Sequence, residues 1–499
     1  MRKKVLLPVD RLSFATIFLL TLLIALLIWG GENCGANCFL HRGPNVTNFS
    51  WQQKQIGAKD RAFILTFDRP MDRATVTENL VIDPPLSGKI SWAGRRIAYT
   101  LNSPAPYGIE YKLKLEKARS RFIGQEQAGE LMEPFVGKFS TRDRAFAYIG
   151  SKGEQKGRLI LYNFTEKRKI ILTPPDLVVV DFKPYPQGDL LLFSALPKVK
   201  DNEGLQNLQL YTVTTGISSD RGQHFKPNKI ELILDNKKYQ NNEFKLSEDG
   251  KIIVVQRINR QNPEEFDLWR IKERNKPQPL KIQGGEFLIA PDSQTLAIAQ
   301  GQGISLLPLE PEAKPLDFLP KFGRVLNFSR DGKAAAMVNY NTDNANLSYT
   351  RSLFYVNNQG IQKELLNTEG SILNCQFSPT ATDIYCLLTE VLEEEKEYIE
   401  RPYLAKINIK TSSVTPLIAW PNYQDIKFSI APDGLGIIFD QVITSNNSES
   451  INTLRTNSGE AIVDGHLWLL IPSVDRANDS NNSQLEELPL VGFNPQWLP

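Results

Sequence analysis

The sequence is short of the residues that most catalytic sites need. It holds only three histidines, His41, His224 and His466, and none of them stands beside a nucleophile motif. The Gly-x-Ser-x-Gly motif of serine hydrolases is absent. We therefore predict no catalytic residues, no cofactor and no metal site, and we expect that the protein is not an enzyme.

Excess charge and helical periodicity are also missing. The 499 residues contain 58 Lys and Arg against 56 Asp and Glu, a formal net charge of +2. This balance lacks the clustered basic excess of nucleic-acid-binding surfaces, so we expect no nucleic-acid partner. Most apolar runs last only four to six residues, and 32 Gly and 31 Pro are spread along the chain, as many turns would require. The pattern predicts an all-β fold.

One long apolar run is the exception. Residues 14–29 are apolar, and four basic residues precede them: Arg2, Lys3, Lys4 and Arg11. A helix needs roughly 17–25 residues to cross a bilayer, and the basic flank stays in the cytoplasm. We predict a cytoplasmic segment over 1–11, a transmembrane signal anchor over 12–30 and a linker over 31–44. A cleaved signal peptide is the alternative, because small residues follow the run.

Cysteine is scarce, and the four that exist fall into two pairs. Outside the cytoplasm an even number invites disulfides. Cys375 and Cys386 flank one hairpin turn, and if Phe377 pairs with Ile384, the same register places the two cysteines opposite each other. We predict a disulfide here, with two buried free thiols as the alternative.

The other pair, Cys34 and Cys38, lies in the linker. These cysteines could pair with each other or between two chains. With His41 they supply too few ligands for a tetrahedral zinc site.

Six or seven short strands are expected within residues 45–142, which suits a β-sandwich. The segment contains Thr66-Phe67-Asp68-Arg69-Pro70-Met71, a tryptophan strand at Trp92, Gly108 to Tyr111, and Phe139 to Thr141. In this combination it resembles the bacterial Ig-like domain of the S-layer-protein type. The resemblance implies an extracytoplasmic spacer or adhesion module without catalytic residues. Asp68 and Asp72 are interpreted as turn residues rather than metal ligands.

A hairpin motif recurs through residues 143–499. Phe328-Ser329-Arg330-Asp331-Gly332 precedes an apolar run, and related copies end at Asp249-Gly250 and Asp433-Gly434. Asp and Gly favour a tight reversal, and a hairpin that repeats every few tens of residues indicates a solenoid or propeller. Each unit is expected to hold four strands.

Two fragments are left over, one at each end of this region. Residues 145–172 supply three strands without a first one, and residues 492–497 supply a first strand with nothing after it. A ring closed by the C-terminal strand accounts for both, because it leaves no unpaired edge. We predict a seven-bladed β-propeller, with six blades as the alternative.

The repeat resembles the TolB-like propeller family, which is also WD40-like, on the strength of Ser329 with Asp331-Gly332, Ser247 with Asp249-Gly250, and Ala431-Pro432-Asp433-Gly434. Glycine is missing from the copies at Asp292-Ser293 and Pro379-Thr380. The two resemblances imply a bacterial protein. Together with the apolar run and its basic flank, this leads us to expect a single-pass protein of the cytoplasmic (inner) membrane, with its C-terminal bulk in the periplasm or outside.

Long connections between second and third strands should gather on one rim and offer a binding surface. One of them, 390–401, carries an acidic patch, and we predict an interaction loop there formed by Glu393, Glu394, Glu395, Glu397 and Glu400. A solvated loop, with charges that serve solubility, is the alternative.

Three functional hypotheses follow. The first is a membrane-anchored scaffold that binds an envelope protein or glycan. The second is a propeller enzyme, lactonase-like or glycan-acting, which requires carboxylates or histidines to converge on the central channel. The third is a structural spacer of the envelope. Propellers host many unrelated activities, so the fold alone does not choose among them.

Overall fold

The computed structural model describes residues 8–32, 43–121, 129–198, 205–217, 226–273, 275–283, 285–301, 303–312, 314–394, 397–421, 425–445, 454–456, 459–472 and 483–499. Cys34, Cys38 and Glu395 therefore lie outside the described residues. The chain divides into two compact units. Unit 1 comprises Met1–Gln52, Ala62–Thr100 and Tyr111–Lys138, and unit 2 comprises Gln53–Arg61, Leu101–Glu110 and Phe139–Pro499.

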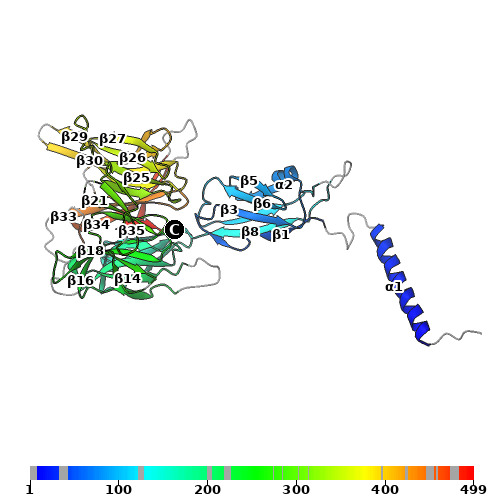
Figure 1. Cartoon of the computed structure of the whole chain (residues 1–499). Helices are drawn as coiled ribbons and strands as arrows, with labels where there is room; N and C mark the ends of the chain where they lie inside the picture. Colours follow the sequence, from blue (N-terminus) through cyan, green and yellow to red (C-terminus); the bar gives the residue numbers. More distant parts are fainter. Residues whose placement is uncertain are drawn as a thin grey trace, which may run out of the picture. The chain divides into compact units, whose positions relative to one another are not determined.

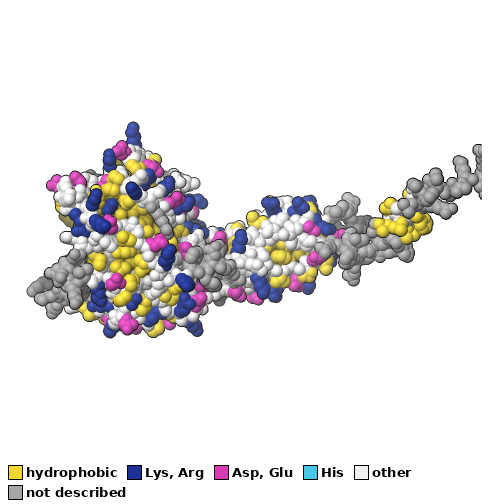
Figure 2. Space-filling view, turned by 90° about the horizontal axis from the view of Figure 1, so that it is seen from below, with side chains coloured by type: hydrophobic (Ala, Val, Ile, Leu, Met, Phe, Trp, Pro, Cys, Tyr) yellow, Lys and Arg dark blue, Asp and Glu magenta, His cyan; other side chains and the backbone are white. Residues whose placement is uncertain are grey.

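The N-terminal apolar run forms the 25-residue helix α1 (Pro8–Glu32). Hydrophobic side chains, among them Phe14 and Phe18, are exposed along its described part (Figure 2). Over the described residues, no helix combines the length and the apolar character that a bilayer crossing demands. The transmembrane helix predicted over 12–30 is therefore not found there.

The first β segment builds two four-stranded sheets, ordered β1-β3-β6-β5 and β2-β8-β7-β4 (Figure 1). Their strands are β1 (Val46–Phe49), β2 (Gln55–Ile56), β3 (Ala62–Phe67), β4 (Leu80–Asp83), β5 (Gly88–Ala93), β6 (Arg96–Leu101), β7 (Glu110–Leu115) and β8 (Phe135–Thr141). Along β3, Phe63, Leu65 and Phe67 are buried while Ala62 and Ile64 are exposed. This alternation shows that β3 turns one face to a core.

Aspartates in this segment serve local structure. Asp72 caps the short helix α2 (Arg73–Asn79) by accepting a bond from Thr75 N at 2.9 Å. Asp68 Oδ1 accepts the backbone N–H of Asn45 at 3.1 Å. Within the described residues, no group of three or more His, Cys, Asp or Glu side chains could hold a metal ion.

The described part of residues 177–419 forms five four-stranded antiparallel sheets, each with its strands in sequence order. The first two sheets are β12 (Leu177–Pro184), β13 (Leu190–Pro197), β14 (Gln209–Thr214) and β15 (Ile230–Leu234), then β16 (Tyr239–Leu246), β17 (Ile252–Asn259), β18 (Phe266–Lys272) and β19 (Gln278–Pro279). The next two are β20 (Phe287–Ile289), β21 (Thr295–Gln300), β22 (Gly303–Pro308) and β23 (Asp317–Leu319), then β24 (Arg324–Phe328), β25 (Ala334–Asn339), β26 (Arg351–Asn357) and β27 (Gln362–Thr368). The fifth sheet is β28 (Ile372–Phe377), β29 (Asp383–Glu394), β30 (Glu397–Asn408) and β31 (Val414–Ala419). An all-β repeat of four-stranded meanders is consistent with a β-propeller.

One sheet is larger, with seven strands ordered β11-β10-β9-β35-β34-β33-β32. Its strands are β9 (Ala145–Gly150), β10 (Leu159–Asn163), β11 (Arg168–Ile171), β32 (Phe428–Ile430), β33 (Ile437–Ser445), β34 (Ala461–Ile471) and β35 (Gln484–Trp497). The 14-residue β35 changes partner along its length. Its first half pairs with β34, from Gln484 opposite Ile471, and its second half pairs with β9, ending with Trp497 opposite Phe146. The C-terminal strand thus joins the earliest and the latest repeats.

The recurring hairpin is built by its Ser-x-Asp-Gly residues. Ser329 Oγ donates to Asp331 Oδ1 at 2.7 Å and accepts the N–H of Ala334 at 3.0 Å, and Gly332 has φ +69°. Ser247, Asp249 and Gly250 repeat this arrangement. In the copies without glycine, Ser293 and Ala381 take positive φ values of 59° and 54°, so the turn keeps its shape.

Cys375 and Cys386 are joined by a disulfide, with an S–S distance of 2.04 Å. They are register partners on β28 and β29, as are Phe377 and Ile384. Both cysteines are fully buried in a core that also contains Leu388.

Candidate interaction site

The β29–β30 hairpin projects from its sheet. The two strands, of 12 residues each, pair out to Glu394 opposite Glu397. Their neighbours are shorter: β28 pairs with β29 only as far as Leu388, and β31 pairs with β30 only from Tyr403 on. The outer part of the hairpin therefore extends past its sheet, at the upper left of Figure 1.

This geometry corrects the prediction of a loop over 390–401. Glu393 and Glu394 belong to β29, and Glu397 and Glu400 belong to β30. Only the Glu400 side chain is among those the structure describes; the side chains of Glu393, Glu394 and Glu397, and the whole of Glu395, are not. Sequence reasoning missed the strands because acidic residues are uncommon in β-sheets.

Two carboxylates at the base of the hairpin have different environments. Glu400 Oε2 accepts the hydroxyl of Thr389 at 2.6 Å, and Thr389 Oγ1 accepts the N–H of Ser371 at 2.6 Å. Glu400 is thus tied to its sheet. Glu390 pairs across the hairpin with Arg401 at 2.6 Å, but the two side chains stay 54% and 42% exposed. Such an exposed pair stabilises a fold little and remains accessible to a partner.

A groove of about 650 Å³ lies beside the hairpin. It is lined by ends of β27, β29, β30 and β31: Thr368, Glu369, Gly370, Thr389, Glu390, Val391, Arg401, Tyr403, Val414, Pro416 and Ala419. Burial raises the pKa of Tyr403, as does the nearby charge of Glu390. A partly apolar lining with a few charged groups suits an inserted side chain of a partner. The lining comes from separate segments, so no local sequence motif marks it.

A second set of polar side chains links the first strands of successive sheets. Gln496 Nε2 donates to Phe182 O at 2.9 Å, and Gln376 Nε2 donates to Phe428 O at 2.8 Å. Asn327 Oδ1 accepts the N–H of Phe377 at 3.3 Å, and Ser429 Oγ accepts the N–H of Trp497 at 3.1 Å. Each bond runs from one first strand to a neighbouring one. These bonds therefore satisfy backbone groups that the sheets themselves leave unpaired.

Two lysines occupy the corresponding positions on β12 and β16. Lys183 Nζ lies 3.7 Å from Asp181, and Lys245 Nζ lies 2.6 Å from Glu243. Burial lowers the pKa of Lys183, and the ammonium groups of Lys245 and Lys427 lower it further, although Asp181 acts the other way. A third of the Lys183 side chain is nevertheless exposed. The lowered pKa and the partial exposure of Lys183 are compatible, because water can reach an ammonium group that is otherwise surrounded by protein.

Asp440 lies close to this charged group. Its side chain is buried, and its two oxygens accept the backbone N–H groups of Lys427 and Asn494, each at 2.7 Å. Burial raises the pKa of Asp440 to about 6. Asn494 also donates to Asp181 Oδ1 at 3.1 Å. Asp440 thus helps to fix the strand that carries Asn494.

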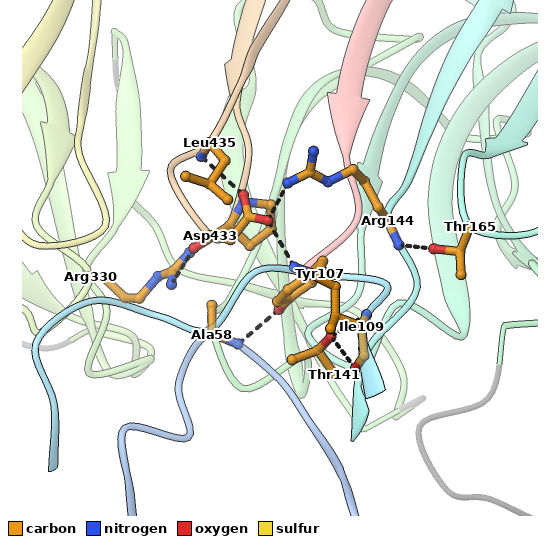
Figure 3. Close-up of polar contacts among 10 residues, drawn as sticks. Ala58, Tyr107, Ile109, Thr141, Arg144, Thr165, Arg330, Asp433 and Leu435 are labelled. Carbon is orange, nitrogen blue, oxygen red and sulfur yellow. Dashed lines mark hydrogen bonds and ion pairs between the residues drawn. The ribbon is translucent and has the colours of Figure 1, made fainter. Parts of the chain in front are cut away.

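Asp433 is the centre of a different cluster, at the turn end of unit 2 (Figure 3). Ala431 stands where other copies of the hairpin have serine, and the oxygen that those serines do not contact, Oδ2, accepts the donors from outside the turn. Asp433 Oδ1 accepts Leu435 N at 3.0 Å, while Oδ2 accepts Tyr107 N at 2.9 Å and Arg144 Nη2 at 2.6 Å. Its side chain is 1% exposed. Asp433 thus ties the segment that carries Tyr107 and the side chain of Arg144 to the turn, because both donate to the same carboxylate oxygen.

No family model matches the chain, and no curated protein matches it. Among solved structures, TolB from Acinetobacter baumannii is 13% identical, with a TM-score of 0.39 over 84% of this chain and 83% of that one. A candidate 6-phosphogluconolactonase from Bacteroides fragilis is 12% identical, with a TM-score of 0.42 over 72% and 98%. Oligogalacturonate lyase from Vibrio parahaemolyticus is 11% identical, with a TM-score of 0.42 over 64% and 90%. At these values none of the likenesses bears on activity.

Proposed function

We propose that this protein is a scaffold of the bacterial cell envelope that binds a partner protein through the β29–β30 hairpin. The observation that carries the proposal is the hairpin itself: it extends past both neighbouring strands and borders a partly apolar groove. Free strand edges accept an extended segment by backbone pairing. The glutamates of the hairpin favour a partner segment that is basic.

The scaffold is proposed to be a seven-bladed ring. In this interpretation the seven-stranded sheet is two blades that share β35. The bonds from Ser429 to Trp497 and from Gln496 to Phe182 support closure, because they link the last, first and second blades in turn. The close approach of first strands in neighbouring sheets agrees with such a ring.

Further parts of the proposal concern the N-terminal region. The apolar run 14–29 supports an anchor in the inner membrane, and the two sheets of residues 46–141 support an Ig-like spacer. Alkaline carbonate extraction of cell membranes tests the anchor. Retention of the full chain in the membrane pellet is expected, and complete release would contradict the anchor.

A shortened hairpin tests the binding role. Leu392 pairs with Ile399, so residues 393–398 can be replaced by Asn-Gly, which forms a two-residue turn at the same register. The variant keeps Glu390, Arg401 and Glu400. We expect crosslinking of whole cells followed by mass spectrometry to lose adducts that the full-length hairpin gives.

A matched variant separates charge from shape. Replacing Glu393, Glu394, Glu395 and Glu397 by glutamine keeps the hairpin length and removes four negative charges. Loss of adducts in both variants indicates charge recognition, and loss in the shortened variant alone indicates strand pairing. An unchanged set of adducts in both would refute the binding role.

A ligand-binding or catalytic channel is the second candidate function. It is favoured by the surroundings of one residue: Lys183 interacts electrostatically with Lys245 and Lys427 of two other sheets, and with Asp181 and Glu243. A channel enzyme requires such convergence of ionisable groups. If neither the hairpin nor this group binds anything, the third hypothesis of a structural spacer remains.

A further inference from the structure

One arginine is buried without a counter-ion. Arg257 lies on β17, close to the connection that leads to β18, and only 5% of its surface is exposed. Among the described residues no ion pair includes Arg257. Arginine is seldom buried unless an opposite charge pairs with it, because an uncompensated buried charge is costly. Arg257 therefore has an unusual environment for its residue type.

Two aromatic rings hold its guanidinium group. The Cζ atom of Arg257 lies 4.4 Å from the ring centre of Tyr239 on β16 and 4.8 Å from that of Trp269 on β18. The two ring centres are 4.9 Å apart and the rings are inclined by 59°, so they form a V around the charge. Cation–π contacts attract the guanidinium without neutralising it. The group thus keeps its positive charge in a defined position.

Asn241 fixes the orientation of the guanidinium. Its Oδ1 accepts the Nε–H of Arg257 at 3.1 Å. Its Nδ2 donates to the backbone oxygens of Leu208 at 2.9 Å and Asp235 at 3.0 Å, next to β14 and β15 of the preceding sheet. Asn241 is fully buried. Arg257 is therefore held at the seam between two sheets.

The two carboxylates near Arg257 are engaged elsewhere. Asp267 is its register partner on β18, but its oxygens accept the backbone N–H groups of Lys281 at 2.8 Å and Ile282 at 2.6 Å. Asp235 Oδ1 accepts the N–H of Lys237 at 3.2 Å. Burial lowers the pKa of Arg257, and the charges of Tyr239 and Asp235 act the other way without forming an ion pair.

The terminal nitrogens of Arg257 are left for a ligand. In the part of the chain that the structure describes, neither Nη1 nor Nη2 has a hydrogen-bond partner. Neither of them is among the sealed side-chain atoms that lack one, so solvent reaches both. The side chain thus presents a two-pronged donor at the surface while its remainder is enclosed by protein.

We propose that Arg257 binds the carboxylate of a small organic ligand through its two Nη groups. A planar guanidinium fork matches two carboxylate oxygens, and its single positive charge matches a single negative one. A phosphate group would bring up to about two negative charges. Tyr239 and Trp269 are only half-buried, so their exposed parts can contact an apolar body of the ligand. The site rests on neither the proposed ring nor the hairpin.

Fluorine NMR tests this site on the unsubstituted chain. The full chain in detergent micelles is labelled with fluorotryptophan at its seven tryptophans, and the Trp269→Phe variant identifies the signal of Trp269. Benzoate, its neutral isostere benzamide, inorganic phosphate and potassium chloride are compared at equal ionic strength. We expect benzoate to shift the Trp269 signal in a saturable manner, because the charge that it pairs with lies 4.8 Å from that ring. The remaining tryptophan signals are the internal control.

The other arms separate a carboxylate site from its alternatives. Benzamide and chloride should leave the Trp269 signal in place. A shift with benzamide as large as with benzoate would mean an apolar contact only, and an equal shift with chloride would mean screening; either result would overturn the proposal. A shift with phosphate alone would overturn the assignment to carboxylates. An unchanged Trp269 signal with all four compounds would refute the site altogether.

A conservative substitution separates binding from structure. Arg257→Lys keeps the positive charge but removes the fork, so the benzoate concentration that gives half of the shift should rise about tenfold. Arg168→Lys, at an exposed arginine of another sheet, should leave this concentration unchanged. Unaltered signals of the other tryptophans show that the Arg257→Lys variant is folded. An unchanged half-shift concentration in Arg257→Lys would contradict binding by the fork, whatever the crosslinking at the hairpin shows.

Discussion

At the turn end of the repeated sheets Asp433 is buried and accepts three donors, whereas at the connection end Glu390 is half exposed and has Arg401 as its ion-pair partner. The first arrangement is costly to disturb, because a buried charge depends on its partners. The second costs little to open. The strongly held Asp433 thus stabilises the turn end of the sheets, whereas the Glu390–Arg401 pair at the connection end can rearrange at little cost.

The largest effect is expected from breaking the turn end. Asp433→Ala removes the acceptor of Tyr107 N and Arg144. We expect it to lower the free energy of unfolding by about 3 kcal/mol, because the arginine and the amide lose their partner. Asp331→Ala is the matched control, since Asp331 holds the same turn position but is 51% exposed. Its loss should stay below about 1 kcal/mol in the same chemical denaturation experiment. Equal losses of unfolding free energy in the two variants would show that burial of Asp433 adds nothing to the stability of its turn.

A second test concerns the base of the projecting hairpin. The Cys375–Cys386 disulfide crosslinks β28 to β29 with a sequence separation of 11 residues. Its removal in a Cys375→Ala/Cys386→Ala variant should cost about 2.5 kcal/mol, from the entropy of closing a short loop. Denaturant midpoints with and without reductant measure the effect. If the midpoints coincide, the bridge does not stabilise the sheet that carries the hairpin.

The pH dependence of stability tests Asp440, which holds Asn494 beside the lysines. Burial raises the pKa of Asp440 from 3.8 to about 6, so the folded protein binds this proton more tightly than the unfolded chain. The resulting stabilisation is fully present below about pH 4 and is lost as the pH rises through about 6. We expect a loss on the order of 3 kcal/mol across this range, relative to Asp440→Asn. Parallel pH profiles of the two proteins would show that Asp440 does not titrate in this way.

The smallest effect is expected at the connection end. Glu390→Gln breaks an exposed ion pair, so the free energy of unfolding should change by no more than about 0.5 kcal/mol. Thermal and chemical denaturation should therefore resemble those of the native chain. A loss comparable to that of Asp433→Ala would mean that the hairpin base is part of the stable scaffold.

The sequence predicts much of the fold because its signals are local. The all-β class and the turns at Asp331 and Asp249 follow from short apolar runs and turn residues, and the structure has them. Asp433 shares the Asp-Gly turn with these two copies, yet its partners Tyr107 and Arg144 lie hundreds of residues away. No local pattern reveals a contact of that kind.

The candidate sites, too, could be predicted only in part from the sequence. The glutamates of 393–400 indicate an acidic surface, but their position on two paired strands depends on the register of β29 and β30. Lys183 and Lys427 are unremarkable charges in the sequence, and only the arrangement of the sheets brings them together. The apolar run 14–29 predicts a spanning helix that the described residues do not supply.

Site-specific photocrosslinking in living cells tests the central claim most directly. A photoreactive amino acid is placed at Ile399 on the projecting hairpin and, as control, at Lys333 beside a short turn. The binding role predicts a defined adduct with an envelope protein from Ile399 and none from Lys333. An adduct from Lys333 alone, or the same adducts from both positions, would contradict it.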